Sequence, residues 1–598
     1  MINNKMNNLK PNKRRYARKC TLFFVTVAIA FNYDRLLISS SLDQHHEKKD
    51  GRQEDEARIS QKDIDICSLF NTDKSPIWSD LKKDILAASY WPMDQANNSN
   101  FTQWIDGLFV EYYNVHQLRR SSFYPADAAA SKVLIEVVSD RMKYLNGQLR
   151  SYSPPMHILV TGGSVTFGMN CAQNPVGIPE ESLNKKFIDC AWPARLENLF
   201  NRGLFQNKKV VKVTNLATGG ASTDVSNVVL EYHLIPEEVK NELPHIVIWA
   251  HAPNDAQAPD KGVILRKHIP EFIIAASNLR MCDDLLPLVV ILEDFYGYEN
   301  YETVNQLSGY LYELATWYGL MGINHANVIK HELWANLDKA HIISNILGGD
   351  YSLHPGMGSH IGVAWTVFYN FLVAFSDSCA DSASGERITK NPMNSKYMGG
   401  YEIGGKYQSI RSTWQRNKNV ALDFCSDQLN SNTAAPSPCT YAFMASTMSG
   451  GVVRPSDLIK KMSRILTANV GWEAAGNPIK QPRTGWYATK PHASFSLRIV
   501  ASLETKYMTI MAMKSYGDRF LNTLLEINVR IQHIDKNRGE SIASYEITGY
   551  HKFRTSIHSP QKFELPGGGA KVNDTIIVNA TLSRGAYFKI NGFAFCQY

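Results

Sequence analysis

Short apolar runs alternate with helical patterns through the middle of the chain. Each run is rich in apolar and β-branched residues at consecutive positions, which is typical of strands that are buried on both faces. These runs lie near 156–161, 210–215, 245–250 and 286–292. Helical patterns lie near 222–235, 263–279, 304–318 and 358–375. The alternation predicts an α/β domain over 151–378, in which helices cover both faces of a parallel sheet to give three layers.

Other patterns flank this domain. Residues 76–150 are mostly helical in pattern, with apolar and aromatic residues spaced to line one side, and we expect this extension to pack against the α/β domain. Residues 467–598 show period-two alternation with intervening turns, which predicts an antiparallel β-sandwich of jelly-roll type. Residues 379–466 are rich in Ser, Asn, Gly, Pro and Lys, and they predict an irregular connector held by disulfides.

The amino-terminal pattern is that of a targeting segment. A basic cluster precedes a mostly apolar stretch from Cys20 to Phe31, which is short for a membrane-spanning helix and suits a signal peptide. An uncleaved signal anchor is the alternative, because Leu36 to Ile38 can extend the apolar run. Residues 1–40 are therefore predicted to be a signal peptide or signal anchor. The polar segment 41–75 is predicted to be a disordered stalk.

The net charge of +7 does not indicate an anionic partner. Residues 1–40 hold eight Lys or Arg and one Asp, which accounts for the whole excess. The rest of the chain is neutral in sum, so no nucleic-acid partner is expected.

Cysteine usage favours an oxidising compartment. Eight cysteines follow the targeting segment, none of them forms a Cys-x-x-Cys pair, and no histidines cluster with them, so we expect disulfides and no metal site. The local pairs expected first are Cys171 with Cys190 and Cys425 with Cys439. The glycosylation sequons fit a lumenal or secreted protein, and they lie at Asn97, Asn100, Asn573 and Asn579.

The run from Met156 to Thr161 ends on Gly162 and Gly163, directly before Ser164. Glycines permit a tight turn, and a helix beginning at the next residue would place its free N–H groups beside the serine hydroxyl. Three further blocks follow in order along the chain. They are Gly219-Gly220 after a second run, His251-Ala-Pro-Asn254-Asp255 after a third, and Asp350-Tyr-Ser-Leu-His354 much later.

With these four blocks the sequence resembles the SGNH (GDSL-type) hydrolase superfamily over about 220 residues, from Met156 to Phe375. The resemblance implies that 151–378 is a catalytic domain in which Ser164 is the nucleophile and His354 the general base. It also implies an oxyanion hole built from the Ser164 amide, the Gly220 amide and the Asn254 side chain. The β-sandwich then resembles an accessory module of a secreted or lumenal member.

The sequence departs from the family pattern at three positions. Gly163 stands where the family has Asp, which we expect to alter the support of the turn more than the reaction, and Ala252 replaces a Gly. At the usual position of the triad acid stands Tyr351, whereas Asp350 lies four residues before His354. We expect Asp350 to reach the imidazole through a one-residue bulge. Another acid or a backbone carbonyl is the alternative.

The sequence thus predicts a serine esterase of the secretory pathway, secreted or anchored in the Golgi or ER membrane, that needs no cofactor. Its expected substrate is a carbohydrate that carries ester groups, such as an O-acetylated polysaccharide, or another small ester. An O-acyltransferase of similar fold is one alternative, because the same serine chemistry transfers acyl groups to sugars when water is excluded. A non-catalytic glycan-binding protein that retains the fold is the other.

Overall fold

The computed structural model describes residue 67 and a series of longer segments, all of which lie in the unit Ile66–Tyr598. These segments are 99–173, 187–257, 261–280, 286–294, 301–329, 354–383, 438–445, 454–477, 481–552 and 556–597. The predicted targeting segment at 1–40 lies outside the described residues, and so does the predicted stalk at 41–75 except for Cys67. Asp350 and Cys425 also lie outside them.

A six-stranded sheet forms the centre of the first domain, in the order β1-β6-β5-β4-β2-β3. Five of its strands run parallel, and they are β2 (Met156–Gly162), β3 (Val211–Asn215), β4 (Ile246–Ala250), β5 (Leu288–Glu293) and β6 (Met321–Asn324). The edge strand β1 (Ser122–Tyr124) pairs antiparallel with β6. The α/β architecture is therefore as predicted, but the sheet is mixed. A three-residue strand inside a helical segment carries too little periodicity to be detected.

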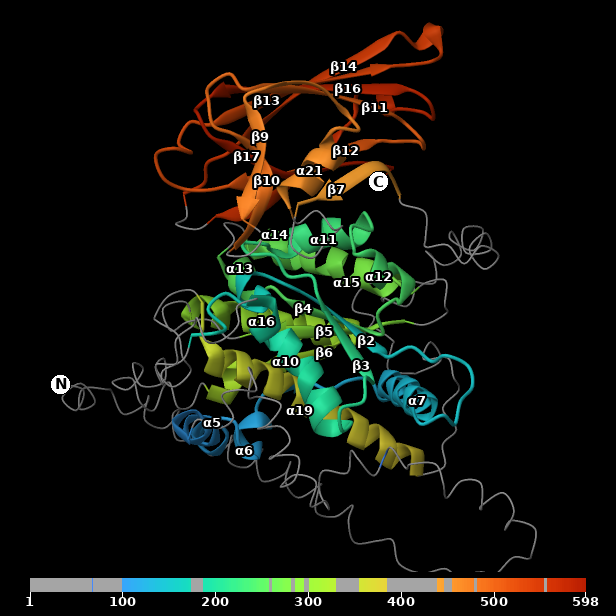
Figure 1. Ribbon diagram of the computed structural model, residues 1–598, viewed down its shortest axis with the longest axis vertical. Coiled ribbons are helices and arrows are strands. Elements are labelled where there is room, and N and C mark those ends of the chain that lie inside the picture. The colour runs from blue at the N-terminus through green and yellow to red at the C-terminus, as the bar shows by residue number, and fades with distance from the viewer. Residues whose placement is uncertain are drawn as a thin grey trace, which may run out of the picture. The chain divides into compact units, whose positions relative to one another are not determined.

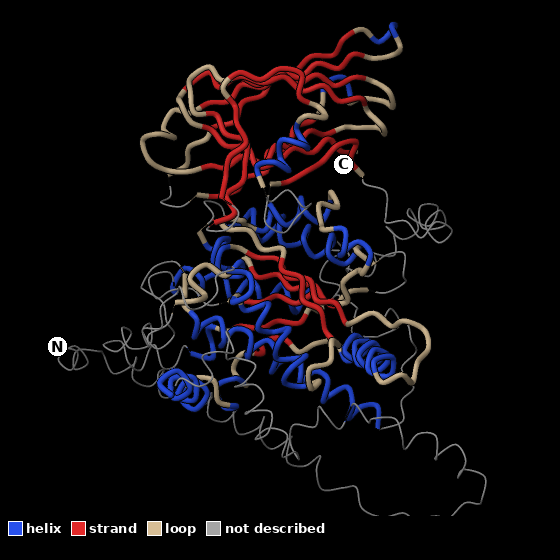
Figure 2. Tube along the Cα trace, viewed as in Figure 1, coloured by secondary structure: helices blue, strands red, loops and turns tan. Residues whose placement is uncertain are grey.

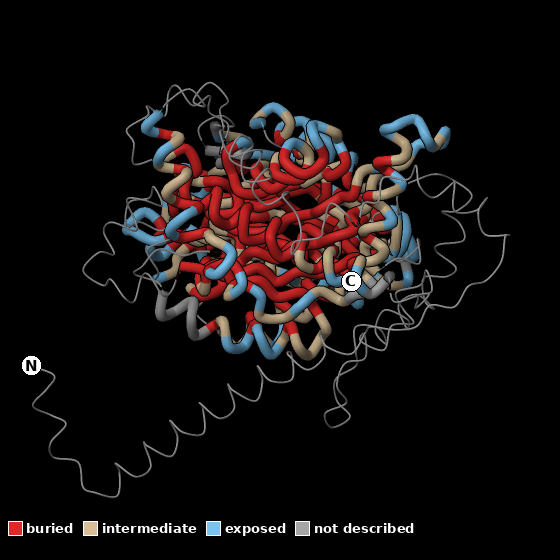
Figure 3. Tube along the Cα trace, turned by 90° about the horizontal axis from the view of Figure 1, so that it is seen from below, coloured by how far each residue is buried: buried red, intermediate tan, exposed pale blue. Residues whose placement is uncertain are grey.

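Helices cover both faces of this sheet (Figure 1). On one face lie α5 (Ser99–Glu111), α6 (Val115–Leu118), α7 (Ala128–Leu145), α10 (Trp192–Asn198) and α19 (Met357–Ala383). On the other lie α11 (Thr223–Glu231), α12 (Glu237–Asn241), α13 (Ala252–Ala256), α15 (Ile269–Asn278) and α16 (Tyr301–Tyr318). Successive strand residues point to opposite faces, so Ile158 and Val160 join the first core and Leu159 the second. The interior is buried throughout (Figure 3).

The helix α19 is the one described helix that is long and apolar enough to cross a membrane. Its apolar window is 89% buried within the protein, which is the burial of a core helix.

The second domain consists of two antiparallel sheets (Figure 2). The first contains β7 (Cys439–Met444), β9 (Trp472–Asn477), β10 (Gln481–Ala488), β12 (Tyr507–Lys514), β15 (Ile557–Glu564) and β17 (Phe588–Cys596). The second contains β8 (Leu466–Val470), β11 (Ser494–Val500), β13 (Leu524–Gln532), β14 (Glu540–Thr548) and β16 (Thr575–Arg584). Residues of both sheets, among them Ile510, Val529 and Val578, share one core. The predicted sandwich architecture is present.

The strand β7 lies inside the segment predicted to be an irregular connector, and here the structure differs from the prediction. β7 pairs with β17 and places Cys439 opposite Cys596, with which it forms a disulfide. The predicted Cys425–Cys439 bridge is therefore wrong, because strand pairing over a separation of 157 residues outweighs proximity in sequence. The predicted Cys171–Cys190 bridge is confirmed, and Cys67 pairs with Cys379. The three disulfides among the described residues are compatible with a secreted protein.

The two domains share apolar core as well as polar contacts. Met444, Met511 and Ala594 of the sandwich belong to the same buried cluster as the outer helices of the first domain. The Tyr232 hydroxyl lies 3.0 Å from Thr509 Oγ1, which adds a buried hydrogen bond between the domains. The sandwich is thus packed on the first domain rather than tethered to it.

We expect the paired substitution Cys439→Ser and Cys596→Ser to lower the free energy of unfolding by about 2–5 kcal/mol, because a long-range disulfide restricts the unfolded chain. Denaturant melts measure the loss. Peptide mapping without reduction tests the pairing directly, and a fragment that joins Cys425 to Cys439 would contradict it.

Candidate active site

Ser164 stands where β2 ends and the short helix α8 (Ser164–Phe167) begins. All residues of β2 are buried, whereas Ser164 is only partly buried. The local fold follows from the sequence, since an apolar strand is stopped by glycines and a helix begins at once. This turn delivers a hydroxyl from the core to the carboxyl end of the sheet, where ligands of open α/β sheets bind.

A Cβ on either glycine before Ser164 would collide with a neighbouring group. A Cβ on Gly162 would lie 2.3 Å from Thr166 Oγ1 and 2.7 Å from the Ala250 carbonyl oxygen. A Cβ on Gly163 would lie 1.9 Å from Asn254 Oδ1. The serine turn is therefore packed directly against the segment that follows β4.

His354 lies across from the serine. Its Nε2 atom is 2.8 Å from Ser164 Oγ, although the two residues are 190 positions apart. Asn170 Nδ2 donates to the His354 carbonyl oxygen at 3.2 Å, and α19 begins three residues later at Met357. The backbone of His354 is thus held between the serine segment and a buried helix. The proposed acid Asp350 falls outside the described residues.

The Gly219-Gly220 turn follows β3 and borders the serine. The Thr218 amide donates to the Gly162 carbonyl oxygen at 3.0 Å, which holds the turn against the end of β2. A Cβ on Gly219 would lie 4.0 Å from Ser164 Cβ. Gly220 has a φ of +76°, a left-handed conformation that favours glycine. The turn thus lies beside the hydroxyl.

Asn254 belongs to α13, which follows β4 directly. Its side-chain oxygen lies against Gly163, so the amide group borders the turn that carries Ser164. The structure therefore gathers Ser164, His354, the Gly219-Gly220 turn and Asn254 at the ends of three adjacent strands.

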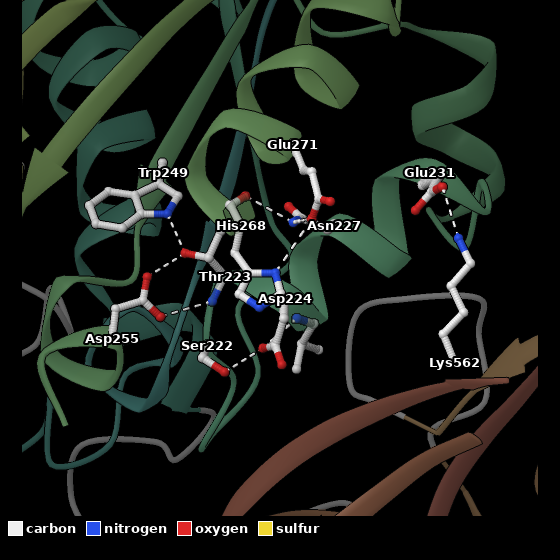
Figure 4. A network of polar contacts seen from close by, with 11 residues as sticks. Ser222, Thr223, Asp224, Asn227, Glu231, Trp249, Asp255, His268, Glu271 and Lys562 are labelled. Atoms are coloured by element: carbon white, nitrogen blue, oxygen red, sulfur yellow. Dashed lines mark hydrogen bonds and ion pairs between the residues drawn. The ribbon is translucent and has the colours of Figure 1, made fainter. Parts of the chain in front are cut away.

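A buried carboxyl group that we did not predict joins two of these segments (Figure 4). Asp255 accepts from the Thr223 amide at 3.0 Å and from the Thr223 hydroxyl, and this hydroxyl accepts from Trp249 Nε1 at 2.6 Å. Burial raises the pKa of Asp255 to about 7. Asp255 thus fixes α13 to the start of α11, directly after the glycine turn. The Asn254-Asp255 pair was visible in the sequence, but its partner was not.

Two further buried groups support the same strand ends. His251 Nδ1 donates to the Ala221 carbonyl oxygen at 3.1 Å, and its Nε2 accepts from Ser226 at 2.8 Å. Burial lowers the pKa of His251 to about 4, so the ring is neutral. Asp294, directly after β5, accepts from the Thr166 hydroxyl at 3.1 Å, and burial raises its pKa well above the usual range. These contacts come from distant segments and leave no signal in the sequence.

A serine within hydrogen-bond distance of a histidine can be activated as a nucleophile. The glycine turn and the asparagine beside it offer N–H groups for a developing oxyanion. The Ser164–His354 contact is therefore suited to acyl transfer by a serine. Within the described residues, no group of three or more His, Cys, Asp or Glu side chains is placed to hold a metal ion.

No protein-family model matches the chain, and no curated protein does. Among solved structures, it is similar to TesA, with 14% identity and a TM-score of 0.24 over 36% of this chain and 97% of that one. It is also similar to TmCBM61 in complex with β-1,4-galactotriose, with 12% identity and a TM-score of 0.16 over 22% and 86% of the two chains. A third similar structure is the CBM36-1 domain of a multidomain xylanase from the hindgut metagenome of Trinervitermes trinervoides. The identity is 10% and the TM-score 0.15, over 22% of this chain and 90% of that one. At TM-scores this low, the likenesses carry no functional argument, and the site is interpreted from its own geometry.

We expect Asp255 to make stability depend on pH. The pKa is about 7 in the folded protein and about 4 in the unfolded chain, so the folded state holds the proton more tightly between these values. Its contribution is present below about pH 4 and is lost as the pH rises through 7. The test is to measure the melting temperatures of the wild type and of Asp255→Asn at several pH values. The melting temperature of the wild type should rise relative to that of the variant as the pH falls from 8 to 4. A constant difference from pH 4 to 8 would contradict the assignment.

Proposed function

We propose that the protein is a serine ester hydrolase in which Ser164 is the nucleophile and His354 the general base. The observation that carries this proposal is the 2.8 Å separation between His354 Nε2 and Ser164 Oγ at the carboxyl end of the sheet. A serine hydroxyl is a weak nucleophile unless a base accepts its proton, and a neutral imidazole at this distance can do so.

In the proposed reaction, Ser164 Oγ attacks the ester carbonyl carbon while its proton passes to His354 Nε2. The negative charge that develops on the carbonyl oxygen is stabilised by the amides of Ser164 and Gly220 and by the side-chain amide of Asn254. The tetrahedral intermediate expels the alcohol, which takes the proton from His354. Water, deprotonated by the same histidine, then attacks the acyl-enzyme and releases the carboxylic acid.

We further propose a small acyl group on a polar alcohol, such as an O-acetylated carbohydrate. Gly163 precedes Ser164, Asn254 contacts Gly163, and Asn170 donates to the His354 backbone. The side chains of these two asparagines can hydrogen-bond to the hydroxyl groups of a polar alcohol. In this scheme Asp350 orients His354.

Ser164 should be the residue labelled by a fluorophosphonate probe in the purified protein, because the geometry supplies it with a base. The labelled peptide is identified by mass spectrometry. Ser164→Ala should abolish both labelling and the hydrolysis of p-nitrophenyl acetate. Labelling of another serine, or equal labelling of the variant, would sink the proposal and leave a glycan-binding protein as the better account.

A side chain at Gly163 should reduce turnover without unfolding the protein. The atom that a new Cβ would meet at 1.9 Å is the end of the Asn254 side chain, which can rotate away. We expect Gly163→Ala to lower kcat by roughly a hundredfold, as loss of an oxyanion donor does, with little change in KM.

Gly309→Ala is the matched control, since a Cβ there meets nothing within 4 Å on α16. This control variant should keep the kcat and KM of the wild type. If Gly163→Ala also keeps them, the position of the Asn254 side chain does not matter to the reaction.

A further inference from the structure

The start of β15, in the second domain, touches the glycine turn beside Ser164. The His558 amide donates to the Gly220 carbonyl oxygen at 3.0 Å. A Cβ on Gly220 would lie 2.5 Å from the Ser556 carbonyl oxygen, so only glycine permits this approach. The turn that we propose as part of the oxyanion hole is therefore fitted to a strand more than 300 residues later in the chain.

The His558 side chain contacts the same turn. Its Nδ1 lies 2.5 Å from Asn591 Nδ2, and its Cδ2 lies 3.6 Å from the place that a Cβ on Gly220 would take, so the ring lies against the turn. Desolvation is the main reason that the pKa of His558 falls to about 3, and the positive charge of Lys589 adds to it, so the ring is neutral. The amide nitrogen of Asn591 can only donate, so Nδ1 accepts from it and the ring proton is on Nε2, which can donate to the Gly219 carbonyl oxygen.

This hydrogen bond sets the direction of a proposed catalytic amide. The Gly219 carbonyl and the Gly220 N–H belong to one planar peptide group, and in a trans peptide they point in opposite directions. Holding the Gly219 oxygen toward the second domain turns the Gly220 N–H away from that domain. The second bond, from the His558 amide to the Gly220 carbonyl, fixes the next peptide as well.

Contacts further along the interface hold β15 in place. Lys562 Nζ lies 3.6 Å from Glu231 Oε1 on α11 (Figure 4). The Tyr232–Thr509 hydrogen bond and the shared apolar cluster add to this anchoring. The strand that carries His558 is thus anchored on the first domain by several contacts.

We propose that His558 is a positioning residue that aims the Gly220 amide at the oxyanion, and that the second domain thereby completes the active site. The inference rests on the proposed function. A positioning role can be told apart from a glycan-binding role of the second domain. Only the positioning role predicts that His558 affects the turnover of a small soluble ester that has no sugar.

The experiment compares three substitutions at His558 in the full-length protein, with p-nitrophenyl acetate as substrate. His558→Ala should lower kcat by roughly ten- to a hundredfold and leave KM within about threefold, because the oxyanion donor acts in the transition state. His558→Gln should recover kcat to within about threefold, since its amide nitrogen can occupy the place of Nε2. His558→Asn, whose amide nitrogen reaches only the place of Nδ1, should behave like alanine.

Thr509→Val is the control for docking of the domain. It removes the hydroxyl that hydrogen-bonds Tyr232 but touches nothing at the glycine turn, so it should lower the melting temperature and leave kcat within about twofold. Wild-type kcat in His558→Ala overturns the inference. An equal loss in Thr509→Val and His558→Ala, or no recovery in His558→Gln, overturns it too, because the effect is then one of docking.

The two proposals fail in different ways. If the wild type is not labelled at Ser164 and does not hydrolyse the ester, the proposed function fails, and the inference with it. If Ser164 is labelled and active while all His558 variants match the wild type, only the role of His558 is wrong.

Discussion

The close approach of backbone at the ends of β2, β3 and β4 is the constraint on which the site depends. Gly162 and Gly163 leave no space for a Cβ, so the serine turn, the Asn254 segment and the glycine turn lie in direct contact. A side chain at Gly162 would meet the Ala250 backbone, and one at Gly163 would displace the Asn254 side chain. In the proposed reaction, Ser164 would then lose the neighbours that stabilise the developing negative charge, because such hydrogen bonds act over less than about 3.2 Å.

Hydrogen bonds between buried polar groups hold these strand ends in one arrangement. Asp255, His251 and Asp294 each link one strand end to another through hydrogen bonds that are shielded from water. Polar groups that lose water must find protein partners, so such contacts specify one arrangement of the segments rather than several. The shifted pKa values of these residues reflect this supporting role, and perturbed titration at a site need not mark the reacting group.

Local pattern predicted much of the fold, and contacts between distant segments account for what it missed. The strands at 156–161 and 245–250 and the sandwich strands were readable because apolar periodicity is a property of neighbouring residues. The short strands β1 and β6 and the pairing of Cys439 with Cys596 depend on partners far along the chain. The order of the motif blocks indicated that Ser164 and His354 would lie together, and their roles remain a prediction. Nothing in the sequence pointed to His558.

The disulfide between β7 and β17 has a consequence for how the protein is made. Cys439 emerges from the ribosome well before its partner, which follows 157 residues later. The helices α11 to α16 of the first domain are made even earlier relative to Met511 and Ala594, which complete their apolar cluster. We expect the apolar surface and the Cys439 thiol to be open to aggregation and wrong pairing during synthesis, until the second domain is complete. The late docking of the two domains, rather than the folding of either one, is then the step at which we expect protein to be lost.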